Sequence, residues 1–324
     1  MSAKKPASRP KKPAAGTKKP AAGAKKTDVK IGRRTLTLSN PDKIYWPESG
    51  FTKGEMVAYY RTVASAMVPH LRNRAVTLKR YPEGVTGFSF FEKNCPKHRP
   101  DWIRTVGVDR KKDGKTVNYC VGWDEATLVW MANLGSIELH ISLSRASNLM
   151  RPTAMVYDLD PGAPATIVEC CELALELKKR FTKLGLEMFP KTSGSKGLHL
   201  YVPLNTAATF QQTGGLAHAI ALELEDEMPD IVVSTQKKTE REGKVLIDWS
   251  QNGPHKTTVA VYSMRARELP TCSTPVTWRE VSACAKKGDP DLLRFTADDV
   301  VRRVKKKGDL FEPVLSLKQK LPRL

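Results

Sequence analysis

Apolar and polar positions along the chain follow two periods. In short segments they alternate at every second residue, as in strands with one buried face; in longer segments apolar residues recur every three or four positions, as in amphipathic helices. Strands are predicted around Asp158 and at residues 35–39, 75–80, 85–91, 103–109, 116–122, 137–142, 187–191, 198–203, 231–234, 244–249 and 258–262. Helices are predicted at residues 52–68, 124–135, 165–184, 208–228, 277–285 and 297–307. This order predicts an α/β (α+β) fold in which helices pack on mixed sheets around a central cleft.

Local end signals support the boundaries of the first three helices. Thr52 and Glu55 form a capping box, in which each side chain accepts a backbone hydrogen bond from the other residue. Asp124 is a suitable N-cap for the second helix. Gly135 and Gly185 follow the second and third helices, where a left-handed conformation usually closes the last turn.

The formal net charge of +20 is unevenly distributed along the 324 residues. Residues 1–26 hold nine Lys or Arg and no acidic residue, interleaved with Ala, Pro and Gly. Such a segment cannot bury enough apolar surface to offset the entropy of ordering, so we predict a disordered Lys/Ala/Pro-rich tail over residues 1–27. A polyanion is its natural partner, and a solubilising tail with no specific partner is the alternative. The remaining body still carries +11, enough for a basic groove on one face.

Hydropathy and cysteine spacing argue against secreted, membrane and zinc-ribbon classes. No apolar stretch approaches the length of a membrane span and the start lacks the apolar core of a secretory signal, so a cytoplasmic protein without a membrane partner is expected. The six cysteines show no paired spacing, and we predict that they are reduced and structural. Cys95 and His98 are half of a four-ligand zinc site, but no nearby pair supplies the other half.

Two carboxylates close the apolar run that begins at Met155. Side chains two apart on a strand share a face, so Asp158 and Asp160 should converge at the point where Pro161 and Gly162 end the strand. Convergent carboxylates can hold two divalent cations, the arrangement used in nucleotidyl transfer. A plain strand followed by a turn is the alternative interpretation.

Two downstream segments favour the metal interpretation. The stretch 191–202 joins a Gly-rich basic loop to an alternating strand, and such a loop offers backbone N–H groups, a hydroxyl, an ammonium and an imidazole to a polyphosphate. A third acid, Asp248, closes the apolar run 244–249. Three acids at strand ends with a phosphate loop between them indicate a phosphate-transfer site.

Together these segments resemble the polymerase module of bacterial ligase D, within the archaeo-eukaryotic primase superfamily. The resemblance covers roughly residues 33–315 and implies a primase-polymerase fold, with residues 28–324 as the catalytic domain. The matching stretches are Ser39–Lys43, Lys79–Pro82, Phe90–Asn94, Asp158–Gly162, Thr192–Tyr201, Val245–Asn252, Lys256–Thr258 and Tyr262–Arg265.

The resemblance implies two divalent cations, Mn²⁺ (preferred) or Mg²⁺, at the three acids. Asp158 and Asp160 would bridge both ions, whereas Asp248 would complete only the ion that activates the primer 3′-hydroxyl. Hard cations with oxygen ligands suit this set. The implied nucleotide-binding residues are His140, Ser193, Lys196, His199, Lys256 and Arg265.

The resemblance also implies a DNA-binding surface. Lys43 and Lys79 match positions that bind the 5′-phosphate of the downstream strand at a gap, and Arg241 matches a loop arginine that meets the primer terminus. Phe90 and Phe91 match positions that stack on template bases. Of two adjacent strand residues one normally faces the core, so the sequence leaves open whether one or both stack.

The implied activity is template-dependent nucleotidyl transfer, which adds preferentially ribonucleotides to fill short gaps at DNA ends in non-homologous end joining or gap repair. The expected partners are gapped or broken DNA with a 5′-phosphate, NTP or dNTP, and Ku and a ligase in trans, at the cytoplasmic nucleoid. A primase that starts chains from two nucleotides shares the three acids and remains an alternative. A catalytically inactive scaffold that holds DNA ends is the second alternative.

Overall fold

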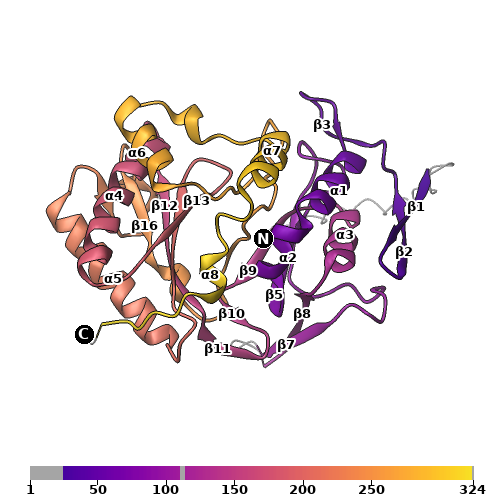
Figure 1. Ribbon diagram of the computed structural model, residues 1–324, viewed down its shortest axis with the longest axis horizontal. Helices are drawn as coiled ribbons and strands as arrows, with labels where there is room; N and C mark the ends of the chain where they lie inside the picture. Colours follow the sequence, from indigo (N-terminus) through magenta and orange to yellow (C-terminus); the bar gives the residue numbers. More distant parts are fainter. Residues whose placement is uncertain (1–24, 110–113, 323–324) are drawn as a thin grey trace, which may run out of the picture.

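Two β-sheets lie side by side in the computed structural model, which describes residues 25–109 and 114–322. In Figure 1 the helices α1, α2 and α3 lie with one sheet, and α4, α5 and α6 lie with the other. None of the helices in the described residues is both long enough and apolar enough to cross a membrane.

The first sheet has six strands, and every pairing in it is antiparallel. Its strand order is β17-β9-β5-β8-β7, with β6 paired to β5 beside this path. The strands are β5 (Arg74–Arg80), β6 (Phe90–Glu92), β7 (Thr105–Asp109), β8 (Thr116–Gly122), β9 (Ser136–Ser142) and β17 (Thr257–Val259). Because β17 comes from the C-terminal half, the two halves of the chain share this sheet.

The second sheet has five strands in the order β13-β14-β12-β16-β15. Its central strand β12 pairs antiparallel with both neighbours, whereas β15 and β16 are parallel. The strands are β12 (Ala154–Pro161), β13 (Phe189–Thr192), β14 (Leu198–Pro203), β15 (Val232–Val233) and β16 (Val245–Asp248).

Two helices begin at the caps that the sequence predicts: Thr52 and Glu55 form the capping box of α1, and Asp124 accepts from the backbone of α3. Helix α4 begins at Thr166, a cap that was not predicted. The helices are α1 (Lys53–Thr62), α2 (Ala64–Leu71), α3 (Glu125–Asn133), α4 (Ile167–Lys183), α5 (Phe210–Glu227), α6 (Trp278–Lys287), α7 (Ala297–Lys307) and α8 (Pro313–Ser316). Short 3₁₀ turns cover Lys238–Glu240, Trp249–Asn252 and Pro290–Leu293.

The predicted and observed elements differ in a few places. The single helix expected over 52–68 is divided at Val63 into α1 and α2, and the strand expected over 85–91 is only β6. Residues 26 and 27, assigned to the tail, lie in a strand, and residues 1–24 lie outside the described residues. Strand β2 (Arg34–Ser39) confirms the strand predicted at 35–39, whereas its hairpin partner β1 (Lys26–Ile31) was not predicted. Two further hairpins were missed altogether: β3 (Ile44–Trp46) with β4 (Phe51–Thr52), and β10 (Ser144–Arg145) with β11 (Asn148–Pro152). Strands β3, β4 and β10 have only two or three residues, which is too short to establish a period of two.

The alternation along β12 separates a packing face from a polar face. Tyr157 is fully buried and contacts Phe181 of α4, with ring centroids 5.5 Å apart. Leu173, Leu177 and Phe181 recur at every fourth position of α4 and are all fully buried. Each such side chain stabilises the fold by about 1.5–3 kcal/mol relative to exposure. Packing therefore fixes the orientation of β12 and leaves its acidic positions on the face away from α4.

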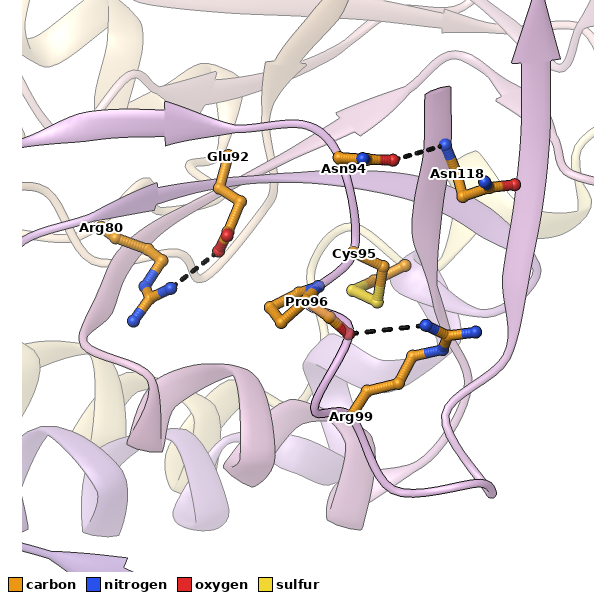
Figure 2. Close-up of a disulfide and its surroundings, with 8 residues drawn as sticks. Arg80, Glu92, Asn94, Cys95, Pro96, Arg99 and Asn118 are labelled. Carbon is orange, nitrogen blue, oxygen red and sulfur yellow. Dashed lines mark hydrogen bonds and ion pairs between the residues drawn. A yellow bond between two sulfur atoms is a disulfide. The ribbon is translucent and has the colours of Figure 1, made fainter. Parts of the chain in front are cut away.

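The prediction that all six cysteines are reduced is wrong for two of them. Cys95, in the loop after β6, forms a disulfide with Cys120 of β8, and Figure 2 shows the bond beside the hydrogen bond from Asn118 to Asn94. The two cysteines are 25 residues apart, so only the folding of this loop against β8 brings them together. A sulfur atom in a disulfide has no thiolate to offer zinc, which removes Cys95 and His98 as half of a zinc site. The other four cysteines are buried and free.

Candidate active site

A single row of paired residues crosses four strands of the second sheet. On β12, Asp158 is paired with His199 of β14 on one side and with Asp248 of β16 on the other. His199 is in turn paired with Lys191 of β13. Directly paired residues project to the same face with Cβ atoms about 4.5–5.5 Å apart. Asp160, two residues beyond Asp158, joins this face, so the strand register gathers the three predicted acids.

Asp158 is held by a histidine and a buried lysine. The Nε2 atom of His199 lies 3.2 Å from Asp158 Oδ1, and its Nδ1 atom lies 3.2 Å from Lys191 Nζ. Burial disfavours the carboxylate, but the nearby His199, Lys191 and Arg265 outweigh it and hold the pKa of Asp158 below its usual value. Burial is also the main reason that the pKa of Lys191 falls to about 7. Asp158 is therefore ionised at neutral pH.

Asp160 faces two cations from two different loops. Lys196 Nζ lies 3.9 Å from its Oδ1 atom, and Arg241 Nη1 lies 3.9 Å from its Oδ2 atom. Burial, Asp158 and Asp248 raise the pKa of Asp160 more than the two cations lower it. The negative charges of Asp158 and Asp248 disfavour the charged form of Asp160, and a bound cation would reduce this repulsion.

Asp248 is oriented by the turn that follows it. Its Oδ1 atom accepts hydrogen bonds from the Ser250 hydroxyl at 2.6 Å and the Ser250 N–H at 3.2 Å, and its Oδ2 atom accepts one from Gln251 at 2.8 Å. These contacts orient the carboxylate, which lines the same pocket as Asp158 and Asp160.

The predicted phosphate loop is closed by its own hydrogen bonds. The Ser193 hydroxyl oxygen accepts from the backbone N–H of Ser195 at 3.2 Å and of Gly197 at 3.1 Å. Two glycines let the loop approach its neighbours: Gly194 has φ +70°, and a Cβ atom on Gly197 would lie 2.1 Å from the carbonyl oxygen of Leu159. The loop is thus packed against β12 immediately beside the acids.

A pocket of about 330 Å³ opens between the acids and this loop. Besides the three acids, the residues that line it include Ser193, Lys196, Arg241, Arg265 and Arg267. Arg267, which the sequence analysis did not select, also donates a hydrogen bond to the Ser195 hydroxyl. The pocket therefore combines carboxylates for cations with basic groups for phosphate.

A buried carboxylate that the sequence analysis missed connects the two sheets. Glu138 of β9 is 3% exposed, and it forms ion pairs with Arg265 Nε at 3.3 Å and Lys79 Nζ at 3.6 Å. It also accepts a hydrogen bond from His140 Nε2 at 3.0 Å. Burial opposes ionisation, but the hydrogen bond from His140 and the charge of Arg265 lower its pKa overall. Since Arg265 also donates to the Ser193 carbonyl at 2.8 Å, Glu138 links the first sheet to the phosphate loop.

An acidic residue between the apolar positions of 137–141 was the available signal for Glu138. A charged side chain among residues that are otherwise buried is rarely tolerated without partners. The sequence did not reveal Lys79 and Arg265 as partners, because they come from β5 and from the segment after β17.

The register of the first sheet distinguishes the two adjacent phenylalanines. Phe91 pairs with Lys79 and is 57% exposed, with its ring centroid 5.4 Å from Lys79 Nζ and 5.5 Å from the His140 ring centroid. Phe90 points to the other face of β6, where it stacks on Phe88. Phe91 is therefore the phenylalanine beside Lys79 and His140.

Two predicted residues lie outside this constellation. Lys43 contacts the segment after β5, with Nζ 2.8 Å from the Pro82 carbonyl and 2.6 Å from Glu83. Lys256 is exposed beside β17 and lines a different, small pocket. The structure does not bring either lysine to the pocket of the acids.

The donor set is suited to hard divalent cations. Carboxylate oxygens on one face of the sheet are the ligands that Mg²⁺ and Mn²⁺ prefer. Among the described residues, no three His, Cys, Asp or Glu side chains are close enough together to form a ready-made ion site. Asp160 contacts Lys196 and Arg241, and Asp248 accepts hydrogen bonds from the turn at Ser250, so a cation would have to exchange these contacts.

The fold and the pocket of three acids define a primase-polymerase. The profile of the LigD primase-polymerase domain matches residues 52–311, and the chain belongs to this family. It is 41% identical over 279 residues to the multifunctional non-homologous end joining protein LigD of Mycolicibacterium smegmatis, and 33% identical over 274 residues to the bifunctional protein LigD of Bacillus subtilis. These alignments cover 86% and 84% of this chain but only 36% and 43% of the relatives.

A solved structure has the same fold. The polymerase domain of Mycobacterium tuberculosis ligase D, in complex with DNA, matches with a TM-score of 0.80 and 36% sequence identity. The match covers 88% of this chain and 99% of that domain. This confirms the α/β primase-polymerase fold and the family that the motifs indicated.

Proposed function

We propose that the chain catalyses template-dependent nucleotidyl transfer and fills short gaps at DNA ends with preferentially ribonucleotides. The observation that carries the proposal is the row formed by Asp158, His199 and Asp248, with Asp160 on the same face and the phosphate loop directly above it. Two-metal nucleotidyl transfer requires such carboxylates beside a polyphosphate site.

The acids would hold two divalent cations, Mn²⁺ in preference or Mg²⁺. Asp158 and Asp160 are the candidates to bridge both ions, and Asp248 is the candidate third ligand for one of them. When bound, the cations would lower the pKa of the primer hydroxyl and neutralise charge on the triphosphate. The protein's own task is then to orient the reactants.

The nucleotide would lie between the loop and the first sheet. Ser193, Lys196 and His199 border the loop side, and Arg265 reaches the same pocket from the segment after β17. His140, beside Glu138, is the candidate contact on the first sheet. Lys256 lines a different pocket, so it could contact the nucleotide only if a phosphate extended beyond the pocket of the acids.

The DNA would approach across β5 and β6. Lys79 and the exposed ring of Phe91 form an adjacent ammonium and aromatic face, which suits a phosphate next to an unstacked base. Phe90 lies on the opposite face of β6 and Lys43 contacts Glu83, so DNA would have to extend past Phe91 to reach either residue. Arg241 borders the acids, where a primer terminus would end. The related domain from M. tuberculosis, whose structure was solved in complex with DNA, supports DNA as the substrate.

We place this activity in non-homologous end joining, which the relatives' names specify for those proteins. Ku and a ligase are the expected partners at the broken end, and the nucleoid is the expected location. A primase that starts chains without a primer is the second candidate, because it would use the same three acids.

Primer extension on gapped, 5′-phosphorylated DNA tests the proposal. We expect nucleotide addition in Mn²⁺, faster with ribonucleotides than with deoxyribonucleotides, and weaker addition in Mg²⁺. Asp158→Asn should reduce the rate about 1,000-fold, because several kcal/mol of metal stabilisation are lost. Asp226→Asn, which changes an exposed carboxylate of α5, is the matched control and should leave the rate unchanged.

The outcomes separate the alternatives. No addition by the wild type on any primer would refute the polymerase and favour the inactive scaffold, which would still bind DNA after replacement of Asp158 and Asp160. Products formed from template and nucleotides without a primer would favour the primase.

A further inference from the structure

Glu138 lies between the proposed DNA surface and the proposed nucleotide pocket, and the proposed chemistry gives it no role. Its side chain is buried on β9 and only 3% exposed. The Oε2 atom lies 3.0 Å from His140 Nε2 and 3.3 Å from Arg265 Nε, and the Oε1 atom lies 3.6 Å from Lys79 Nζ. One carboxylate therefore contacts three side chains that the proposed function assigns to substrates.

Two neutral donors complete the surroundings of Oε1. The Tyr81 hydroxyl donates to it at 3.4 Å, and the backbone N–H of Ala266 donates at 3.3 Å. The partners of the carboxylate thus come from β5, from β9 itself and from the segments that follow β5 and β17. A glutamine at this position would turn an NH₂ group toward donors whichever way its amide were oriented. The surroundings therefore require an acceptor on both branches of the side chain.

The negative charge of Glu138 also allows two cations to lie close to each other. Like charges repel, and the repulsion is stronger at a buried site than in water. Lys79 Nζ and Arg265 Nε contact different oxygens of the same carboxylate, so both are attracted toward it. Without this charge, only repulsion would act between the ammonium and the guanidinium group until a phosphate binds.

We propose that Glu138 is a positioning residue that holds Lys79 on the DNA surface and Arg265 at the nucleotide pocket in a fixed relation. Arg265 also donates to the Ser193 carbonyl at 2.8 Å, so its guanidinium group is fixed between the carboxylate and the phosphate loop. DNA and nucleotide would then meet in a geometry that exists before either binds. The assignment of substrates to the two cations rests on the proposed function, whereas their shared carboxylate does not.

Binding and extension by Glu138→Gln test the proposal. Nucleotide affinity is measured with mant-GTP and Mg²⁺ in the absence of DNA. DNA affinity is measured by fluorescence anisotropy with labelled gapped, 5′-phosphorylated DNA in the absence of nucleotide. We expect each affinity to fall about 10-fold, the effect of one hydrogen bond to a charged group. The single-turnover rate of extension at saturating substrates should fall about 10- to 100-fold, because the reactants are misplaced.

Two comparisons separate positioning from a general loss of stability. Glu280→Gln removes another carboxylate that is paired with an arginine and a lysine, Arg303 and Lys307, and it should leave both affinities and the rate unchanged. Because Glu138 would act on the nucleotide through Arg265, Glu138→Gln should cost no further nucleotide affinity in an Arg265→Met background.

Each outcome decides the proposal. A folded Glu138→Gln with wild-type affinities would overturn it, and so would equal losses in Glu280→Gln or a loss that adds to that of Arg265→Met. If Glu138→Gln does not fold, Glu138→Asp keeps the charge but withdraws it by one methylene group, and wild-type affinities in that variant would also overturn it. A wild type that binds GTP and DNA but extends no primer would refute the proposed function, and the affinities would still decide the role of Glu138.

Discussion

Gly162 is the point at which the acid-bearing strand meets the loop of Arg241, and its replacement by alanine is a sharp test of the site. An ideal Cβ atom on Gly162 would lie 1.8 Å from the carbonyl oxygen of Arg241. Real Cβ atoms do not approach closer than 3.0 Å, so the two segments would have to separate by about 1.2 Å. Because the obstacle is backbone, no side-chain rotation can relieve it.

The separation would displace Arg241 from Asp160, where Nη1 now lies 3.9 Å from Oδ2. A misplacement of about 1 Å in a catalytic site can reduce the rate about 100-fold. We therefore expect Gly162→Ala to lower the single-turnover rate of extension on gapped DNA by about 100-fold. Overpacking should also destabilise the fold by about 1–3 kcal/mol.

The matched control is Gly215→Ala in the interior of α5. A Cβ atom there would meet nothing within 4 Å, so this change should leave the rate unchanged. Alanine should also stabilise the helix by about 0.5–1 kcal/mol, measured by urea unfolding. If Gly162→Ala retains the rate of Gly215→Ala, the placement of Arg241 against β12 does not matter for catalysis and the reasoning is refuted.

Two further predictions concern stability. Burial opposes the charge on Glu280, but hydrogen bonds from Arg303 at 2.7 Å and Lys307 at 3.0 Å contribute to a pKa below the usual 4.5. Such a depressed pKa stabilises the fold above pH 4.5 and loses this effect as the pH falls further. Glu280→Gln should therefore cost about 2 kcal/mol in urea unfolding at pH 7 and less at pH 4; an equal loss at both would contradict the ion pair. The bond between Cys95 and Cys120 closes a loop of 25 residues, so Cys95→Ser should cost about 3 kcal/mol. Dithiothreitol should destabilise the wild type to the same level and leave the variant unchanged, whereas an equal effect on both would argue against the bond.

The sequence predicted the elements with strong periodicity. The capping box at Thr52 and the left-handed glycines Gly135 and Gly185 gave helix ends that the structure reproduces. Strand β1 and the two short hairpins β3–β4 and β10–β11 were missed, and the division of the first helix at Val63 has no signal in the apolar spacing. Local periodicity is informative only where a segment is long enough to show it.

The sequence identified some of the candidate site residues and not others. Asp158, Asp160 and Asp248 were visible as acids that close apolar runs, and their gathering in one pocket agrees with that expectation. Glu138 and Lys191 were not selected, because a single charged residue within a strand does not reveal its partners. Arg265, the partner of Glu138, and Ser273, the partner of Lys191, come from the segment after β17, and sequence spacing does not show that this segment packs against β9 and β13.

The sequence by itself determined which face is polar in the strands that alternate clearly, where the Gly-rich loop follows its strand, and which family the motifs resemble. These properties depend on neighbours along the chain, where alternation and turn preferences act. Only the tertiary structure decided the row from Lys191 through His199 and Asp158 to Asp248, and the bond between Cys95 and Cys120. Each depends on which strands or loops lie side by side, and packing between distant segments sets that arrangement.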